Sequence, residues 1–196
     1  MPIGASRLPF LALSSAAEAE ATRAGFVNTT SIGTAQLSNA QYKFSTGTRG
    51  GSILFDGDSD RIESQVGTIT GDFTVECWIW INPASNSLAG IVTSTTQTTS
   101  GFILARNGAG IANANSAGVN FISWTLPTST WAHVALTMQS NRLFAFVNGT
   151  FISSLAATFS NLSDTVRLGS RYADSNPWPF IGYISNLRIL SGVALY

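Results

Sequence analysis

Short apolar runs separated by turn-forming residues dominate the chain from about residue 51 onwards. Within most of these runs the apolar residues recur at every second position, which predicts strands that turn one face to a core. We expect the following segments to be strands: SILF, RIES, FTVECWIWI, GIVTS, GFILA, VNFIS, WAHVALTMQ, RLFAFV, TFISSL, VRLG and FIGYISNLRIL. No segment of this part has a helical period, and the frequent turn signals are typical of an all-β sandwich or barrel.

The run at residues 73–81 shows the alternation most clearly. One predicted face carries Phe73, Val75, Cys77, Ile79 and Ile81, and the other carries Thr74, Glu76, Trp78 and Trp80. Because both faces hold large apolar groups, we expect a central strand rather than an edge strand. Cys77 is then a small buried hydrophobe, and as the single cysteine of the chain it cannot form an internal disulfide.

The run WAHVALTMQ holds the single histidine of the chain. Alternation places Val134 and Leu136 on the core face and His133 on the opposite face. The next segment, FVNGTF, has Asn148 and Gly149 between two apolar runs, a pair that strongly favours a type I′ hairpin turn because both central residues need a positive φ. We expect His133 to make a structural hydrogen bond, as buried polar groups generally do.

The first 48 residues differ from the rest of the chain in composition and in the pattern of apolar residues. Ser15 and Glu18 form a capping box, and alanine-rich helix formers follow it, so we expect one short helix near residues 15–24. We therefore divide the chain into an N-terminal arm and lead-in segment, residues 1–48, and a sandwich domain, residues 49–196.

The beginning of the arm is apolar without being amphipathic. Its stretch LPFLAL is shorter than the roughly 7 residues of a signal-peptide core, so we expect it to be retained in the protein. Ile3, Leu8, Phe10 and Leu11 have no helix face that could bury them, and an uncovered apolar segment usually marks a protein partner. The alternative is that the arm folds back onto its own sandwich.

Composition excludes several classes of function. Charged residues make up 10% of the 196 residues, against about 25% in ordinary domains. The net charge is zero and the basic residues are scattered, so we expect no nucleic-acid binding. No apolar run approaches the roughly 20 residues that span a bilayer, so we expect no membrane segment.

The chain lacks a recognisable catalytic set. Glu76 is the lone acid on its strand, whereas two-carboxylate glycosidases need a pair about 5 to 10 Å apart. No Gly-x-Ser-x-Gly motif accompanies His133, and no acid stands at a recognisable spacing from it. The sequence therefore predicts a protein that is not an enzyme.

Two loops carry candidate binding residues. Asp56, Asp58 and Asp60 alternate in the segment DGDSD, which we interpret as a polar turn, with a calcium site as the open alternative. No other cofactor is expected. Trp178 stands between two prolines in the loop YADSNPWPF, where it is a candidate contact residue for a partner. We expect the remaining tryptophans to be core residues rather than a glycan platform.

Six segments in order resemble the laminin-G-like, concanavalin A-like jelly rolls over roughly residues 50–196. They are SILFDGDSDRI, GDFTVECWIWI, WAHVALT, FVNG, RLGSR and FIGYISNLRILSGVALY. The closing GYISNLR strand with its GVALY, and the lead-in TAQLSNAQYKFSTGTRGGSILFDG, are similar to domains of bacteriophage virion proteins, those of cyanophages among them. The resemblance implies a two-sheet antiparallel jelly-roll sandwich that serves as a binding or assembly module. Asn148 stands where many relatives have aspartate, which removes a carboxylate that could have helped to bind a cation.

From this resemblance we expect a structural protein of a phage virion, located on the capsid surface. The function that we favour is a capsid decoration or cement protein that binds the phage major capsid protein or another virion protein, and that associates with further copies of itself. The alternative is a tail or fibre lectin-like module that binds host surface glycans.

Overall fold

The computed structural model of the chain describes most of the predicted sandwich. The described residues are 27–38, 51–58, 60–94, 101–112, 119–159, 165–171 and 178–196. The helix predicted near residues 15–24 lies outside them.

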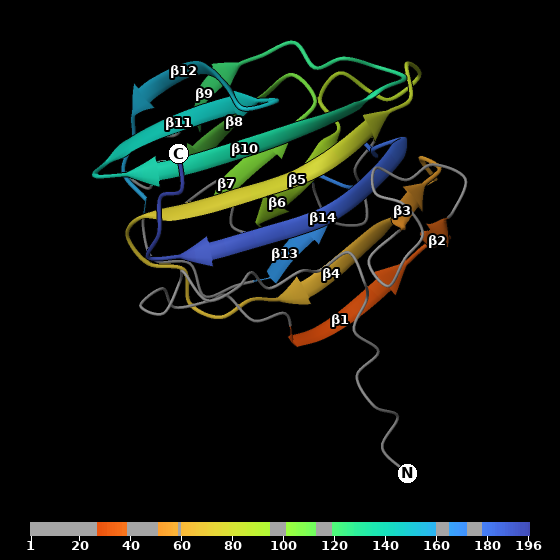
Figure 1. Ribbon diagram of the computed structural model, residues 1–196. Helices are drawn as coiled ribbons and strands as arrows, with labels where there is room; N and C mark the ends of the chain where they lie inside the picture. Colours follow the sequence, from red (N-terminus) through yellow and green to blue (C-terminus); the bar gives the residue numbers. More distant parts are fainter. Residues whose placement is uncertain are drawn as a thin grey trace.

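Two antiparallel sheets of seven strands each face one another in the described part of the chain (Figure 1). The front sheet, nearer the viewer, has the order β12 (Thr150–Ala156), β11 (Arg142–Val147), β10 (Trp131–Gln139), β5 (Phe73–Ile81), β14 (Gly182–Ser191), β3 (Ser52–Phe55) and β2 (Gln36–Ser38). The back sheet has the order β1 (Val27–Ile32), β4 (Arg61–Gln65), β13 (Thr165–Leu168), β6 (Gly90–Ser94), β7 (Phe102–Ala105), β8 (Gly108–Ala112) and β9 (Val119–Ser123). The predicted all-β sandwich is confirmed. The described residues contain no helix, and so none that could cross a membrane.

The core lies between the two sheets, and β5 is the centre of the front sheet. It pairs with β10 on one side and β14 on the other, as expected of a central strand. The five residues of its predicted core face are fully buried, Cys77 among them. Phe73 reaches Phe102 of β7 with ring centroids 5.8 Å apart, which joins the two sheets. Burial of each large apolar side chain stabilises the fold by roughly 1.5–3 kcal/mol.

The predicted hairpin joins β11 and β12. Asn148 and Gly149 have φ angles of 51° and 76°, the left-handed values that a type I′ turn requires. The turn is fastened to β10, because the Asn148 side chain accepts a hydrogen bond from the His133 backbone N–H at 2.8 Å. The ladder between β11 and β12 shifts register after Ala145, which leaves Ile152 as an extra residue at the edge of the sheet.

Three strands were not predicted. β8 has the sequence GAGIA, whose small residues have low strand propensity and no clear alternation. A side chain at Gly108 would collide with the backbone oxygen of Ile122, 2.3 Å from the position of a Cβ. The close approach of the β9 backbone thus explains why β8 has glycine at position 108.

The other two unpredicted strands come from the lead-in segment. β1 pairs with β4 in the back sheet, and β2 pairs with β3 in the front sheet. The sheets therefore extend before residue 49, where we placed the start of the sandwich domain. Both strands lie at sheet edges, and their sequences, VNTTSI and QLS, lack the apolar alternation of a strand that faces a core.

Candidate functional site

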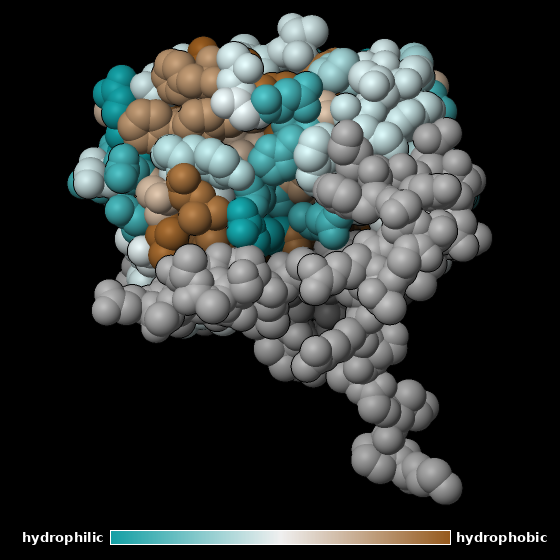
Figure 2. Space-filling view, viewed as in Figure 1, coloured by the Kyte–Doolittle hydropathy of each residue, from teal (hydrophilic) through white to brown (hydrophobic). Residues whose placement is uncertain are grey.

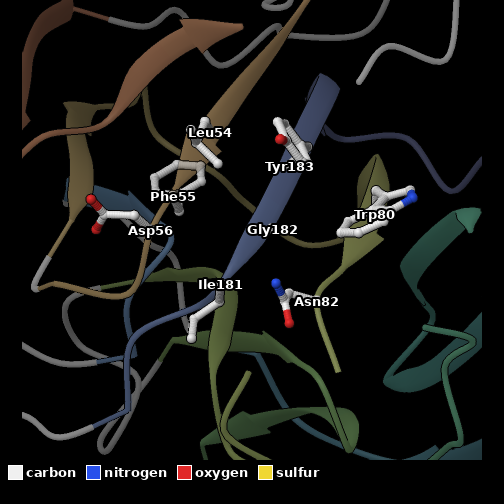
Figure 3. Close-up of a pocket in the computed structure, with 8 residues that line it drawn as sticks. All are labelled: Leu54, Phe55, Asp56, Trp80, Asn82, Ile181, Gly182 and Tyr183. Carbon is white, nitrogen blue, oxygen red and sulfur yellow. The ribbon is translucent and has the colours of Figure 1, made fainter. Parts of the chain in front are cut away.

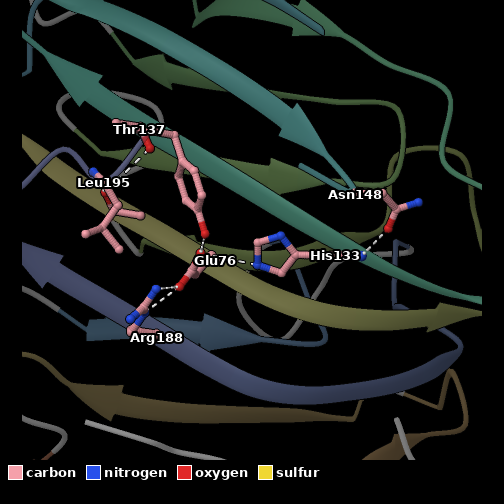
Figure 4. A network of polar contacts seen from close by, with 8 residues as sticks. Glu76, His133, Thr137, Asn148, Arg188 and Leu195 are labelled. Atoms are coloured by element: carbon pink, nitrogen blue, oxygen red, sulfur yellow. Dashed lines mark hydrogen bonds and ion pairs between the residues drawn. The ribbon is translucent and has the colours of Figure 1, made fainter. Parts of the chain in front are cut away.

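The outer face of the front sheet carries the most distinctive group of polar side chains. β5 turns Glu76 to this face, and the flanking strands present His133 and Arg188 beside it (Figure 4). Arg188 reaches the same face because β14 has an irregularity between Ser185 and Arg188, with Asn186 at a φ of 49°. If the four residues from Ser185 to Arg188 alternated regularly, without this irregularity, Arg188 would point towards the core.

Glu76 is almost completely buried, with 5% of its surface exposed, and both of its carboxylate oxygens are occupied. The Arg188 guanidinium donates to Oε1. His133 Nε2 lies 3.2 Å from Oε2, and the Tyr196 hydroxyl donates to the same oxygen. The structural hydrogen bond expected for His133 is therefore present, and its partner is an acid that the sequence spacing did not suggest.

The protonation states in this cluster follow from the contacts. Burial by itself would raise the pKa of Glu76, but the hydrogen bonds from His133 and Tyr196 and the charge of Arg188 hold it below its ordinary value. Burial and the bond to Glu76 raise the pKa of Tyr196 to about 12. The carboxylate is thus ionised and the phenol protonated at neutral pH. A carboxylate so fully paired is a structural anchor rather than a general acid or base.

Residues 192–196 lie across the outer face beside this cluster. The buried hydroxyl of Thr74 donates to the carbonyl of Val193 at 2.9 Å, and it accepts from the N–H of Leu195 at 3.0 Å. These two bonds and the Tyr196 hydroxyl fix the segment on β5. Figure 4 shows Leu195 beside the strand.

A group of apolar side chains, which we call the aromatic surface, adjoins the segment. It consists of Phe144, Phe146, Phe151, Ile152, Leu195 and Tyr196. The ring centroid of Phe146 lies 5.8 Å from that of Phe151 and 5.3 Å from that of Tyr196, so the three rings form one continuous group. Among the described residues the exposed large hydrophobic side chains all belong to it: Phe151 at 53%, Tyr196 at 44%, Ile152 at 40% and Leu195 at 38%. Figure 2 shows apolar side chains gathered over β11 and β12.

A cleft of about 350 Å³ lies where β3, β5 and β14 end (Figure 3). It is lined by Leu54, Phe55, Asp56, Trp80, Asn82, Ile181, Gly182 and Tyr183. Trp80 and Tyr183 face each other edge to face at 5.6 Å, and Trp131 stands opposite Trp80 on β10. Two aromatic side chains on adjacent strands thus line the cleft, with a third, Trp131, on the next strand.

The three aspartates of the DGDSD segment form a turn that binds neighbouring backbone. Asp60 is fully buried and accepts from the backbone N–H of Asp56 at 3.0 Å and from the backbone N–H of Thr34. Asp56 accepts from the N–H of Asp58 at 2.9 Å and from the Thr34 hydroxyl at 2.8 Å, and these two bonds lower its pKa. The described residues contain no group of three side chains that could hold a metal ion. The aspartates instead fasten the β1–β2 turn to the loop between β3 and β4.

The other candidates divide between the described and the undescribed parts of the chain. Trp178 is half-buried, and the guanidinium carbon of Arg171 lies 5.2 Å from its ring centroid. Trp124 is a core residue whose indole N–H donates to the Ala105 carbonyl at 2.9 Å. Trp78, Trp80 and Trp131 are half-buried on the outer face of the front sheet rather than in the core. The arm residues Ile3, Leu8, Phe10 and Leu11 lie outside the described residues.

Sequence reasoning missed Arg188 and Tyr196 as parts of the site. A signal for Arg188 was present, because a lone arginine in the apolar segment NLRIL has to find a partner, and the lone glutamate of another predicted strand could provide it. No local signal pointed to Tyr196, which follows the last strand and reaches Glu76 from an irregular segment.

Comparison with known proteins identifies the family to which this architecture belongs. The family model described as the concanavalin A-like lectin/glucanases superfamily matches residues 56–195, well over half of the chain. The chain belongs to this superfamily. The jelly-roll fold and the predicted concanavalin A-like resemblance are thereby confirmed. Among curated proteins none matches the chain.

Solved structures show the same fold at low sequence identity. Domain 4 of AbnA, a GH43 extracellular arabinanase from Geobacillus stearothermophilus solved in complex with arabinotriose, matches with a TM-score of 0.61 and 16% identity, over 88% of this chain and 95% of that one. The binding domain of Paraclostridial Mosquitocidal Protein 1 matches with a TM-score of 0.63 and 12% identity, over 86% of this chain and 45% of that one. The botulinum neurotoxin type G receptor binding domain matches with a TM-score of 0.56 and 13% identity, over 83% and 44%. The chain thus spans less than half of either toxin domain, and the likeness to all three concerns the fold alone.

Proposed function

We propose that this protein is a non-enzymatic structural protein of a phage virion, a capsid decoration or cement protein on the capsid surface. The aromatic surface carries the proposal, because a rigid sheet face with exposed phenylalanine and tyrosine side chains is typical of a protein contact. The apolar arm, with Ile3, Leu8, Phe10 and Leu11, supplies the attachment to coat subunits in this proposal. The virion setting rests on the resemblance of the lead-in and closing segments to phage virion domains.

The contacts of Glu76 support a role without catalysis. Its carboxylate is paired with Arg188, His133 and Tyr196, so it has no free oxygen with which to attack a glycosidic bond or to accept a proton. Retaining and inverting glycosidases both need a second carboxylate at about 5 to 10 Å. No second acid takes part in the cluster that the structure describes around Glu76.

The test is attachment to particles. Deletion of residues 1–25 removes the apolar part of the arm and leaves all the described strands intact, so we expect the truncated protein to fold, which circular dichroism checks. We expect it to lose binding to the source particles in a sedimentation assay, whereas the full chain binds at a fixed number of copies per particle. Electron microscopy of the particle then locates the full chain. Binding of the truncated protein at the occupancy of the full chain contradicts the proposal.

A second candidate function is supported by the cleft at Trp80 and Tyr183. Aromatic rings beside the Asn82 amide suit a sugar ring, which offers an apolar face and hydroxyl groups. On this alternative the protein is a tail or fibre module that binds host glycans. Binding to a glycan array that is lost in Trp80→Ala and kept in Trp178→Ala would support this alternative. If the intact protein binds no glycan on the array, this alternative is wrong.

A further inference from the structure

The six side chains of the aromatic surface carry no charge. Glu76 and Arg188, the nearest charges on β5 and β14, neutralise each other beneath Tyr196. Arg142, at the start of β11, is exposed on the same face as Phe144, and its Nε donates to the Ser154 hydroxyl at 2.9 Å, so one positive charge lies at the margin of the surface. β12 itself has the sequence TFISSLA, without a charged residue. The centre of this surface therefore selects a partner by shape and apolar contact, and Arg142 is a charge at its margin.

The size of the surface indicates the kind of contact that it makes. Its four exposed side chains offer roughly 350 Å², if a large side chain has about 200 Å² of surface. A standard interface buries about 800 Å² on each partner, so the aromatic surface can be the centre of an interface whose rim is polar. Gln139, Arg142 and Ser154 lie on the same outer face as Phe144 and supply polar groups at its margin.

We propose that the aromatic surface is the contact between two copies of this chain, related by a twofold axis. A twofold contact brings the same patch of both copies together, so the patch must be compatible with itself. An uncharged group of aromatic and aliphatic side chains meets this condition, and the zero net charge of the chain means that two copies do not repel each other through their net charge. Phe151 and Ile152 lie on an edge strand, where two copies can approach without a clash between their sheets.

This inference rests on the proposed function for its setting. A contact centred on about 350 Å² of apolar surface is weak in dilute solution, and it is strengthened when copies occupy neighbouring positions on a particle. The contact itself can be measured on the isolated full chain.

Cross-linking through an introduced cysteine tests the contact directly. Cys77 is fully buried and does not compete for the reagent. Ile152→Cys places a thiol on the aromatic surface, and Ala84→Cys places one on the exposed turn after β5 as the matched control. Under mild oxidation at high protein concentration, we expect Ile152→Cys to form a disulfide-linked dimer at least tenfold faster than Ala84→Cys. Equal rates for the two variants overturn the proposal.

Sedimentation of the unmodified protein provides the second measurement. We expect a concentration-dependent dimer whose dissociation constant rises at least tenfold in Phe151→Ser. The dissociation constant should be unchanged in Ala84→Ser, which alters the exposed turn after β5. A wild-type protein that stays monomeric up to millimolar concentration overturns the proposal, as does Phe151-dependent binding of a glycan or an isolated coat subunit instead of a second copy.

Particle binding separates this proposal from the proposed function. If Phe151→Ser still attaches to particles but fails to dimerise, both proposals stand. If the full chain dimerises in solution but never attaches to particles, the contact between copies stands and the virion function fails.

Discussion

At the scale of single residues, Glu76 shows how a strand can carry one charge through an apolar sheet. The sequence predicted correctly that this glutamate is the only acid of β5 and lies on the face opposite to the core. Its partners Arg188 and Tyr196 are 112 and 120 positions away, and no local pattern encodes such pairings. They depend on the register between β5 and β14 and on the extra residue Asn186, which the alternation of apolar residues does not reveal.

Removal of the charge on Glu76 should destabilise the fold. In Glu76→Gln the guanidinium of Arg188 stays partly buried without its counter-ion, so we expect the free energy of unfolding to fall by roughly 3 kcal/mol. Tyr196→Phe removes one hydrogen bond only and should cost about 1 kcal/mol. Urea denaturation followed by tryptophan fluorescence measures both. A loss in Glu76→Gln no larger than that in Tyr196→Phe would show that the ion pair adds little.

The same carboxylate gives stability a defined pH dependence. Its pKa in the folded protein is lower than the ordinary value of 4.5, so its contribution is complete above the unfolded pKa and is lost as the pH falls towards the folded pKa. The stability difference between the wild type and Glu76→Gln should therefore be large at neutral pH and shrink below pH 4.5. Denaturation curves across this range check it. A stability difference between the two proteins that grows as the pH falls would contradict a lowered pKa of Glu76 in the folded state.

At the scale of elements, the alternation of apolar and polar residues predicted the strands that turn one face to the core. It located β5, β10 and β11 because these strands turn one face to the core, whereas β12, which has no buried residue, was located through the Asn148–Gly149 turn before it. It failed for β1 and β2, which lie at sheet edges, and for β8, where the approach of a neighbouring strand favours small residues. Apolar alternation thus recovers strands with one large apolar face, and it misses strands such as β8, whose buried residues include glycine and alanine.

The hairpin turn offers a test of its backbone geometry. Gly149 has a φ of 76° and open space around its missing Cβ, so a substitution there is strained only by the backbone conformation. We expect Gly149→Ala to lower the free energy of unfolding by about 1 kcal/mol and Gly149→Asn to cost less than half of that, because asparagine tolerates the left-handed region. Thermal denaturation compares the two. Equal losses would point to a lost contact instead of backbone strain.

At the scale of the whole molecule, the buried thiol of Cys77 reports on the integrity of the sandwich. Burial raises the pKa of this thiol, and the side chain lies between two sheets that cover it completely. We expect no reaction with a thiol reagent at pH 8 until the protein unfolds, so the labelling rate in urea should follow the unfolding rate. Ala84→Cys, with its exposed second thiol, should be labelled at once in native protein. Rapid labelling of Cys77 without denaturant would reveal local opening of the core.

The extra residue in β14 also bears on how the length of the chain can vary. Because the side chains before and after Asn186 are in opposite phase, a deletion of this residue would regularise the strand and leave Ser185, Leu187 and Arg188 on their present faces. A deletion elsewhere in the strand would exchange core and surface residues in one of its halves. Asn186 therefore marks the point in β14 at which related chains can differ by one residue and still keep the same anchor beneath the same surface.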